Sequence, residues 1–454
     1  MNTMSDVDSS RASPPLSSLL LATAQVTEAV LGGQSMTEAL AAVSTPSRAA
    51  TQALAFHTMR QLGWARAVKN QLIARTPPSP LLDALALVAI ALLKPSDAAS
   101  KAAIIDFHTA AMPSYAPHTV VDQAVTAAAN DEEMARFKGL LNGSLRRFLR
   151  ERNDVLRMID RDLEAKWNHP MWWIALVRNT YPQQWEEVLA GAQRPAPLTL
   201  RVNRRQATPE QVIAAFAEAG VTAVPVGESG LMLTQPRPVT QLPGFAEGWW
   251  SVQDAGAQLA ALLLPLKDGM RVLDACAAPG GKTAHMLELA DVEMLALDSD
   301  ARRLTRVTEN LDRLKLNSSK VTVKAASALD LDSWWDGKPF DAVLADVPCT
   351  ASGIVRRHPD IRWLRRQDDV ARTATLQSRM TDALWRTVAP GGHMLYVTCS
   401  IFPAEGARQA AAFSRRHADA ERLNAPGQLL PIAAEATAET QRDGFFYALF
   451  AKQS

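Results

Sequence analysis

The chain has 454 residues, 47% of them hydrophobic, and its 48 Lys and Arg against 47 Asp and Glu give a net charge of +1. This length suggests about three domains, and the balanced charge excludes a globally basic nucleic-acid-binding protein, so any such surface must be local. The three cysteines are too few for an extracellular disulfide framework and include no C-x-x-C pair, which predicts a reducing, cytoplasmic environment and no zinc site.

The first third of the chain predicts helices. Residues 1–15 are polar and lack the basic start of a signal peptide, so we expect a disordered tail there. Residues 16–155 are rich in Ala, Leu and Arg, with apolar residues at helical spacing and prolines that divide them into several short helices. Even the apolar stretch "LSSLLLATAQVTEAVLGG" contains Gln25 and Glu28, which is too polar for a membrane span. We therefore expect a soluble protein with an all-α domain over residues 16–155.

The next segment, residues 156–245, predicts a small α+β unit. Two helical stretches flank "NHPMWW" and "YPQQW", and "LTLRVN", "VTAVPV" and "GLMLTQ" have the pattern of strands. Between them "TPEQVIAAFAEAG" predicts a helix that begins at Thr208 and Pro209 and ends at Gly220.

From about residue 246 to the end, short apolar strands alternate with helical stretches. The strands are "RVLDA", "EMLALD", "KVTVKAA", "FDAVLADV", "HMLYVTC" and "FFYALFA". Buried strands between crossover helices predict an α/β fold with a mostly parallel sheet, whose ligands bind at the carboxyl ends of the strands.

The segment "RVLDACAAPGGKTAHMLELA" is a candidate ligand site, because a Gly-rich turn lets the backbone approach a ligand and points helix N-terminal amides at it. A P-loop would need a Gly five positions before Gly281, where Cys276 stands. A Rossmann-type cofactor site fits better, since Asp298 ends the next strand 17 residues after Gly281 and can accept hydrogen bonds from two ribose hydroxyls. The pattern leaves NAD and S-adenosylmethionine as alternatives, and Asp298 could cap the following helix instead of, or as well as, holding a ribose.

The other two cysteines, in "ADVPCTASG" and "YVTCSIFP", also follow apolar strands, so Cys349 and Cys399 should reach the same edge of the sheet. One use for such a thiol is the methylation of a ring carbon in a base. Carbon 5 of cytosine is not nucleophilic by itself, and it becomes nucleophilic when a thiolate adds to carbon 6. The alternative is that free cysteines are small buried hydrophobes. Two such strand ends beside the Gly-rich loop favour the chemical role.

The chain resembles the RNA 5-methylcytosine methyltransferases of the Sun/Fmu/NOL1-NOP2 family in "DACAAPGGKT", "DVPCTASG", "YVTCSIFP" and "DGFFYALFAK". Segments such as "FKGLLNGSLRRFLR" and "LPGFAEGWWSVQDAGAQLAALLL" resemble the bacterial 16S ribosomal RNA branch and extend the resemblance to residues 16–452. It implies an all-α NusB-like RNA-binding domain (16–155), a small α+β, RRM-like linking domain (156–245) and an α/β Rossmann-like class I methyltransferase domain (246–454).

The resemblance also implies roles for single residues. Cys399 would be the nucleophile, and Cys349 would help to release the product. Asp346 would lie beside the cofactor and hydrogen-bond ring nitrogen 3 of the base, Asp298 would hold the ribose, and Lys282 would contact the base as well. S-adenosylmethionine would lie along the loop formed by Cys276, Ala277, Ala278, Pro279, Gly280, Gly281 and Lys282.

One position departs from the family pattern. Family members usually carry an Asp after the third strand, near the adenine. In "VKAASALDLD" this place holds Ser327, with Asp330 three residues further on. A serine hydroxyl hydrogen-bonds more weakly than a carboxylate. We assign Ser327 to the cofactor site, with Asp330 as the alternative.

Two local basic clusters are candidate RNA contacts. Residues 136–161 carry eight Lys or Arg against three acids, and "RRHPDIRWLRR" (356–366) carries five Arg and follows the Cys349 loop. Arg side chains suit phosphates and bases, and we expect RNA contact at the second cluster. For the first cluster, RNA contact and an ordinary solvated face remain equal alternatives. Arg201, Arg204 and Arg205 add to the candidates.

The resemblance implies methyl transfer from S-adenosylmethionine to carbon 5 of a cytosine in 16S ribosomal RNA, through a covalent cysteine adduct. By resemblance the target is the cytosine numbered 967, in RNA that is naked or in an early assembly intermediate. We expect a monomer without membrane or metal partners. Transfer RNA is an alternative substrate, against which the NusB-like region argues. An RNA-binding scaffold with an inactive domain is a second alternative, against which the complete set of thiols, loop and Asp346 argues.

Overall fold

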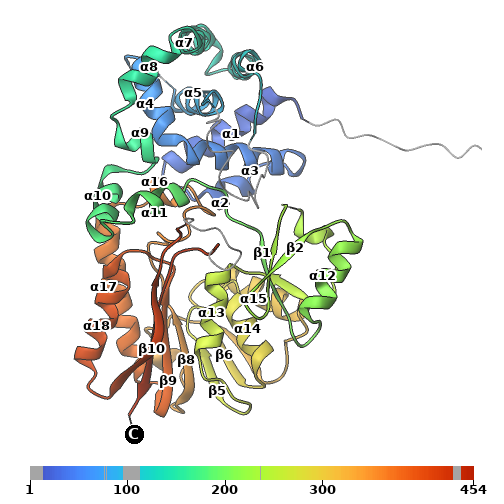
Figure 1. Cartoon of the computed structure of the whole chain (residues 1–454), viewed down its shortest axis with the longest axis vertical. Helices are drawn as coiled ribbons and strands as arrows, with labels where there is room; N and C mark the ends of the chain where they lie inside the picture. The colour runs from blue at the N-terminus through green and yellow to red at the C-terminus, as the bar shows by residue number, and fades with distance from the viewer. Residues whose placement is uncertain are drawn as a thin grey trace, which may run out of the picture. The chain divides into compact units, whose positions relative to one another are not determined.

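The computed structural model describes residues 14–75, 77, 79–95, 113–235, 237–432 and 441–453. These residues divide into two compact units, one ending at residue 171 and the other beginning at residue 172 (Figure 1). The described part of the first unit is all-helical, and the second unit contains both sheets. No helix in the described ranges is long and apolar enough to cross a membrane.

The first unit confirms the all-helical expectation. Within it α1 packs against α3, α5 and α6, and the apolar residues at helical spacing are buried between them. Ser79 begins α5 by accepting a hydrogen bond from Leu82 N, and Pro80 supplies the fixed φ of the first turn. The helices are α1 (Leu16–Leu31), α2 (Met36–Ala41), α3 (Thr45–Arg60), α4 (Leu62–Leu72), α5 (Pro80–Leu92), α6 (Pro117–Ala129), the 3-10 turn η2 (Ala135–Phe137), α7 (Lys138–Arg150), α8 (Arg152–Ile159) and α9 (Leu163–Trp167).

The second unit begins with two helices and the expected small α+β part. Its four-stranded antiparallel sheet has the order β2-β3-β1-β4 and buries Val212 and Phe216 of α12 against its core. Thr208 and Gln211 form a capping box at the start of α12. The elements are α10 (Met171–Thr180), α11 (Trp185–Gly191), β1 (Thr199–Val202), α12 (Pro209–Glu218), β2 (Ala223–Val226), β3 (Gly230–Leu233), η3 (Val239–Gln241) and β4 (Trp250–Val252).

The larger sheet of the second unit has seven strands in the order β10-β11-β9-β8-β5-β6-β7. The run from β9 to β7 is parallel, while β11 lies antiparallel to both β9 and β10. The elements are α13 (Ala255–Leu263), β5 (Arg271–Asp274), α14 (Gly281–Leu289), β6 (Glu293–Asp298), α15 (Ala301–Arg313), β7 (Val321–Ala325), η4 (Leu331–Ser333), β8 (Phe340–Asp346), α16 (Ile361–Leu364), α17 (Gln367–Trp385), β9 (Val388–Thr398), η5 (Pro403–Glu405), α18 (Ala407–Arg416), β10 (Ala420–Leu429) and β11 (Phe445–Lys452).

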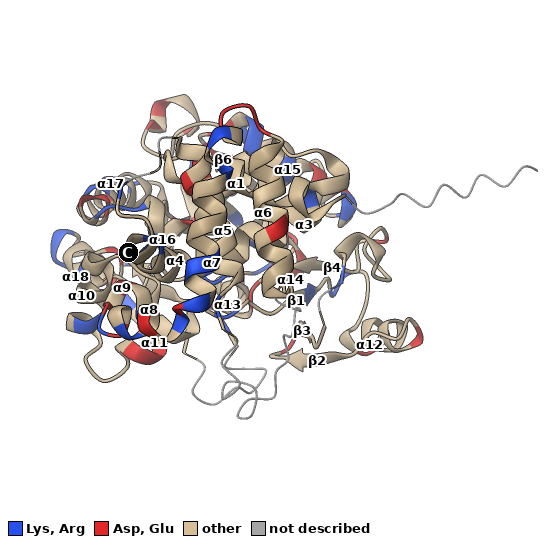
Figure 2. Ribbon diagram, turned by 90° about the horizontal axis from the view of Figure 1, so that it is seen from above, with Lys and Arg blue, Asp and Glu red and all other residues tan. Residues whose placement is uncertain are grey.

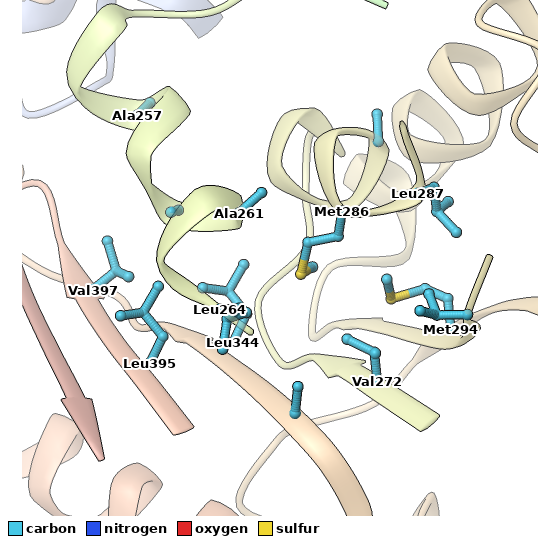
Figure 3. Close-up of a cluster of buried hydrophobic side chains, with 14 of the residues drawn as sticks. Ala257, Ala261, Leu264, Val272, Met286, Leu287, Met294, Leu344, Leu395 and Val397 are labelled. Atoms are coloured by element: carbon cyan, nitrogen blue, oxygen red, sulfur yellow. The ribbon is translucent and has the colours of Figure 1, made fainter. Parts of the chain in front are cut away.

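Helices cover both faces of this sheet, which confirms the expected Rossmann-like fold. Successive strand residues point to opposite faces, so Val272 of β5 packs with α13, α14 and α15, and Leu273 packs on the side of α17 and α18 (Figure 1). Figure 3 shows the first of these clusters, in which Met286 and Leu264 lie over Val272, Leu344 and other strand residues. The two cores hold the parallel strands in place. The carboxyl ends of these strands lie at one edge of the sheet.

Candidate active site

The Gly-rich loop between β5 and α14 lies at that carboxyl edge. Ala277 N donates a hydrogen bond to Leu297 O at 2.7 Å, and Ala278 N donates to Asp298 Oδ2 at 3.2 Å, so the loop is held across the end of β6. Gly280 has φ +96°, and a Cβ there would lie 3.1 Å from the Cα of Val307 on α15. The Gly280 backbone therefore needs a residue without a side chain.

Asp298 ends β6 next to this loop and is almost fully buried, with 4% of its surface exposed. Its carboxylate accepts hydrogen bonds from Ala278 N and from Asp300 N, and Arg303 lies 3.6 Å away. The cap of α15 is Asp300, whose side chain accepts from Arg302 N and Arg303 N. The helix-cap alternative for Asp298 is therefore wrong. A carboxylate has about four acceptor positions, which leaves room for ligand hydroxyls.

Lys282 and Asp346 form an ion pair at the same edge. Lys282, in the first turn of α14, donates to Asp346 Oδ2 at 2.5 Å, and its ammonium lies 5.6 Å from the centre of the Phe445 ring. Burial lowers the pKa of Lys282, but the charge and hydrogen bond of Asp346 and the charge of Cys399 outweigh it, so the pKa lies above its usual value. Lys282 is therefore a cation next to both Asp346 and Cys399.

Cys349 and Cys399 lie side by side. Cys399 directly follows β9, Cys349 follows β8, and these strands are parallel neighbours. Their sulfur atoms are 3.4 Å apart, and both residues are half-buried. The hydrogen bond to Cys399, burial, and the charges of Cys399 and Glu405 raise the pKa of the Cys349 thiol. Cys349 therefore stays protonated near neutral pH and can donate to the sulfur of Cys399.

Cys276 and Ser327 lie on two other loops of the carboxyl edge, after β5 and β7. Burial, and then the charges of Asp346, Asp274 and Asp298, raise the pKa of the Cys276 thiol, which disfavours its reactive thiolate form. Ser327 is exposed two residues after β7, and its Oγ accepts a hydrogen bond from Leu329 N at 3.3 Å. Its hydroxyl is thus partly occupied by a local turn.

Asp274, the last residue of β5, was not predicted as a site residue from the sequence. It is fully buried, and its Oδ2 accepts a hydrogen bond from Thr283 Oγ1 at 2.6 Å. Burial raises its pKa to about 7, opposed in part by the hydrogen bond from Thr283. Its place at a strand end, directly before the Gly-rich loop, was the signal that could have found it.

The prediction that the run 356–366 contacts RNA is wrong for most of its arginines. Arg356 and Arg357 pair with the buried carboxylates of Asp254 and Asp443. Arg362 is fully buried and donates to the carbonyls of Ala192 and Val355, and the half-buried Arg365 donates to Thr350 O. Only Arg366 of the five is exposed. The guanidinium groups of the other four have a structural role, because they bind carboxylates and backbone carbonyls of other segments.

The expectation that Arg201 contacts RNA is also wrong. This residue of β1 is fully buried, with Nε and Nη2 on the two carboxylate oxygens of Glu288 at 2.8 and 2.7 Å. Its Nη1 donates to Gly281 O at 2.8 Å and to Gln253 Oε1. Arg201 is thus part of the support of α14, and it cannot reach RNA. Arg204 and Arg205 are exposed.

The basic cluster on the first unit is exposed. Figure 2 marks its Lys and Arg on α7 and α8 in blue. Arg147 pairs with Glu151, and Arg157 pairs with Asp154. Arg146 donates a hydrogen bond to Asn142, which carries no charge. The exposed basic residues are Arg136, Lys138, Arg146, Arg147, Arg150, Arg157 and Arg161.

Within the described residues, no group of three or more His, Cys, Asp or Glu is arranged to hold a metal ion.

Residues 261–451 match a family model described as 16S rRNA methyltransferase RsmB/F, and residues 169–240 match a ferredoxin-like domain of RsmF/B-like methyltransferases.

Curated relatives cover nearly the whole chain. A protein of Pseudomonas putida named ribosomal RNA small subunit methyltransferase B is 40% identical over 445 residues, 95% of this chain and 98% of its own. A Vibrio cholerae protein of the same name is 42% identical and covers 74% of this chain and 77% of its own.

Solved structures show the same fold. The crystal structure of PH0851 covers 97% of this chain and 100% of its own, with a TM-score of 0.74 and 24% identity. A methyltransferase homolog from Pyrococcus horikoshii covers 64% of this chain and 97% of its own, with a TM-score of 0.54 and 26% identity. The resemblance inferred from the cysteine and glycine motifs is confirmed by these matches. The cofactor is S-adenosylmethionine, and the chain belongs to the 16S rRNA methyltransferase RsmB/F family.

Proposed function

We propose that this protein transfers a methyl group to carbon 5 of a cytosine in 16S ribosomal RNA through a covalent adduct with Cys399. The observation that carries the proposal is the pair of sulfur atoms 3.4 Å apart, at the ends of adjacent parallel strands and beside the Lys282–Asp346 ion pair. The substrate class comes from relatives named ribosomal RNA small subunit methyltransferase B. By resemblance, the target is the cytosine numbered 967.

The residues at the carboxyl edge fit S-adenosylmethionine. The loop from Cys276 to Lys282 has the glycine backbone that close approach needs, and Asp298 keeps acceptor positions for the ribose hydroxyls. Ser327, beyond β7, is assigned to the adenine side. When bound there, the cofactor supplies an electrophilic methyl group.

The chain's own groups activate the base. The Cys399 thiolate, next to the Lys282 ammonium, adds to carbon 6 and forms a carbon–sulfur bond, and the displaced electron pair makes carbon 5 nucleophilic. Ring nitrogen 3 gains negative charge as this occurs. The hydrogen-bonded Asp346–Lys282 pair supplies the proton that stabilises this charge.

Product release needs a second step. The proton on carbon 5 leaves to solvent, its electron pair restores the ring double bond, and the bond between carbon 6 and the Cys399 sulfur breaks. Ring nitrogen 3 returns its proton to the Asp346–Lys282 pair. The departing sulfur carries a negative charge. Cys349, which stays protonated, lies 3.4 Å away and donates its proton to that sulfur.

The RNA must bring the cytosine out of its base stack to reach Cys399. Opening costs only a few kcal/mol in a loop or a loosely folded region, so naked RNA or an early assembly intermediate is the preferred substrate. We assign RNA docking to the exposed basic residues of α7 and α8.

Bisulfite sequencing of total RNA from cells with and without this protein tests the proposal. We expect protection of one 16S cytosine to disappear when the protein is absent. A 16S RNA that stays methylated, or a mark lost from transfer RNA instead, would contradict the proposed substrate.

A further inference from the structure

Glu405, the last residue of η5, is fully buried and has no part in the mechanism above. Its Oε1 accepts hydrogen bonds from Thr350 N at 2.8 Å and Thr373 Oγ1 at 2.6 Å, with Gln377 Nε2 at 3.4 Å. Its Oε2 accepts from Thr350 Oγ1 at 2.5 Å and Ser400 Oγ at 2.6 Å. One carboxylate thus collects five hydrogen bonds from four side chains and one backbone amide.

The carboxylate has no ionic partner to explain its burial. No ion pair within 4.0 Å joins Glu405 to a Lys, Arg or His of the described ranges. A buried carboxylate is costly unless hydrogen bonds replace its hydration, and here hydroxyl and amide donors do so. An ionised carboxylate, which only accepts, suits this position because five donors from four residues point at it.

Two of the donors directly follow the two thiols in the chain. Thr350 comes after Cys349, and Ser400 comes after Cys399, so Glu405 joins both loops at the residue next to each sulfur. The same loops meet again where Gly353 N donates to Cys399 O at 2.9 Å. Thr373 lies on α17 and follows neither thiol.

We propose that Glu405 is a positioning residue that holds the Cys349 and Cys399 loops against each other and so sets the separation of their sulfur atoms. The inference rests on the proposed function, in which Cys349 must donate to the Cys399 sulfur as the product leaves. A displacement of about 1 Å of a reacting group can cost about 100-fold in rate. Loss of Glu405 should therefore act on product release through the thiols.

Two pairs of variants separate this role from simple stabilisation. Glu405→Ala removes the tie, whereas Glu405→Gln keeps its shape, because the hydroxyls of Thr350 and Ser400 can rotate to accept from the new amide. Ser400→Ala and Thr373→Val each remove one hydroxyl that donates to Glu405 at 2.6 Å. Only the Ser400 change frees a thiol loop.

The separation of the thiols can be measured without RNA. In the full-length protein, diamide takes up the two thiol hydrogens of Cys349 and Cys399, and mass spectrometry of peptides measures the rate at which this disulfide forms. We expect the rate to fall at least about tenfold in Glu405→Ala and Ser400→Ala. Thr373→Val should stay within about threefold of the unchanged protein, and Glu405→Gln should recover most of the loss seen with Ala.

Equal rates in Ser400→Ala and Thr373→Val would overturn the proposal, even if Glu405→Ala fails to fold. A second measurement follows turnover on a 16S RNA fragment. We expect kcat to fall with the disulfide rate while KM for RNA stays unchanged. If the unchanged protein does not methylate cytosine, the proposed function fails, and the disulfide rates still decide the role of Glu405.

Discussion

At the scale of single residues, the three cysteines have three different surroundings. Cys276 and Cys349 both have raised pKa values, the first through burial and nearby acids, the second chiefly through its hydrogen bond to Cys399 and burial. Cys399 lies next to the Lys282 ammonium. In the proposed mechanism this charged neighbour favours Cys399 as the nucleophile.

The two thiols of the pair should give different phenotypes. Cys399→Ala should abolish methylation and form no covalent RNA adduct, with cofactor affinity close to normal, because the thiol supplies chemistry and little binding. Cys349→Ala should attack the base and then stall. We expect a protein–RNA adduct that survives denaturing gel electrophoresis. Exchanged phenotypes would reverse the roles of the two residues.

Asp298 can be tested against a neighbour of the same type. Asp298→Ala removes the acceptor of the ribose hydroxyls, and charge-assisted hydrogen bonds contribute about 1.5–3 kcal/mol each, so cofactor affinity should fall about tenfold or more. Asp300→Ala removes the α15 cap and should lower stability while leaving cofactor affinity close to normal. Calorimetric titration with S-adenosylmethionine measures the cofactor affinity of both variants. Equal affinities in the two variants would contradict the ribose assignment.

The buried carboxyl of Asp274 predicts a pH effect on stability. Its pKa is about 7 in the folded protein against a reference of 3.8, so between these values the unfolded chain has lost a proton that the folded chain keeps. Stability should fall as pH rises through this window, by about 4 kcal/mol at most. In Asp274→Asn the unfolding free energy, measured by urea titration from pH 4 to 8 without cofactor, should lack this decline. Parallel curves for the two proteins would show that Asp274 does not titrate there.

The residue scale also shows what could be predicted from the sequence. Four predicted site residues follow strands directly or closely: Asp298, Asp346, Cys349 and Cys399. Because parallel strands bring their carboxyl ends to one edge of the sheet, the strand pattern in the sequence was enough to predict their common location. The arginines of 356–366 were misjudged because their burial depends on Asp254 and Asp443, which no local pattern connects to them.

At the scale of elements, the small sheet supports the cofactor helix. Through Arg201, β1 holds both Glu288 near the end of α14 and the Gly281 carbonyl at its start. This link could not be predicted from the sequence, since a buried ion pair between segments 87 residues apart leaves no periodic signal. Strand β4 was not predicted either, because its three residues are too few to show alternation.

The Arg201–Glu288 pair gives a test of this support. Arg201→Met leaves a buried carboxylate unpaired, which costs about 3–5 kcal/mol, and it frees the first turn of α14. We expect lower stability in urea titration and weaker binding of S-adenosylmethionine. Arg204→Met, three residues after Arg201 and paired with Glu228 only at the surface, should cost less than about 1 kcal/mol. A loss of similar size in both variants would contradict the proposed support.

At the scale of the whole molecule, the net charge of +1 conceals an uneven distribution. Among the described residues, the exposed Lys138, Arg146 and Arg150 of α7 have no acidic partner within 4.0 Å, whereas Arg356 and Arg357 of the second unit pair with buried carboxylates and Arg362 donates to backbone carbonyls. We therefore propose that long-range attraction for RNA belongs to the first unit and the chemistry to the second. The order of helical and α/β segments was predicted from periodicity, but this division of charge was not.

Salt dependence tests this division. Changing Arg146, Arg150 and Arg161 to Gln removes three exposed cations from the first unit. If each contacts a phosphate, the slope of log Kd against log salt should fall by about two, since each contact contributes about 0.7 for single-stranded RNA. The control changes Lys267, Lys320 and Lys338 to Gln, which alters net charge equally. These lysines precede β5, β7 and β8 and therefore lie at the amino edge of the sheet, opposite the thiols. Filter binding of a 16S stem-loop fragment at several KCl concentrations should show the smaller slope only for the arginine variant, and equal slopes in both variants would place RNA docking elsewhere.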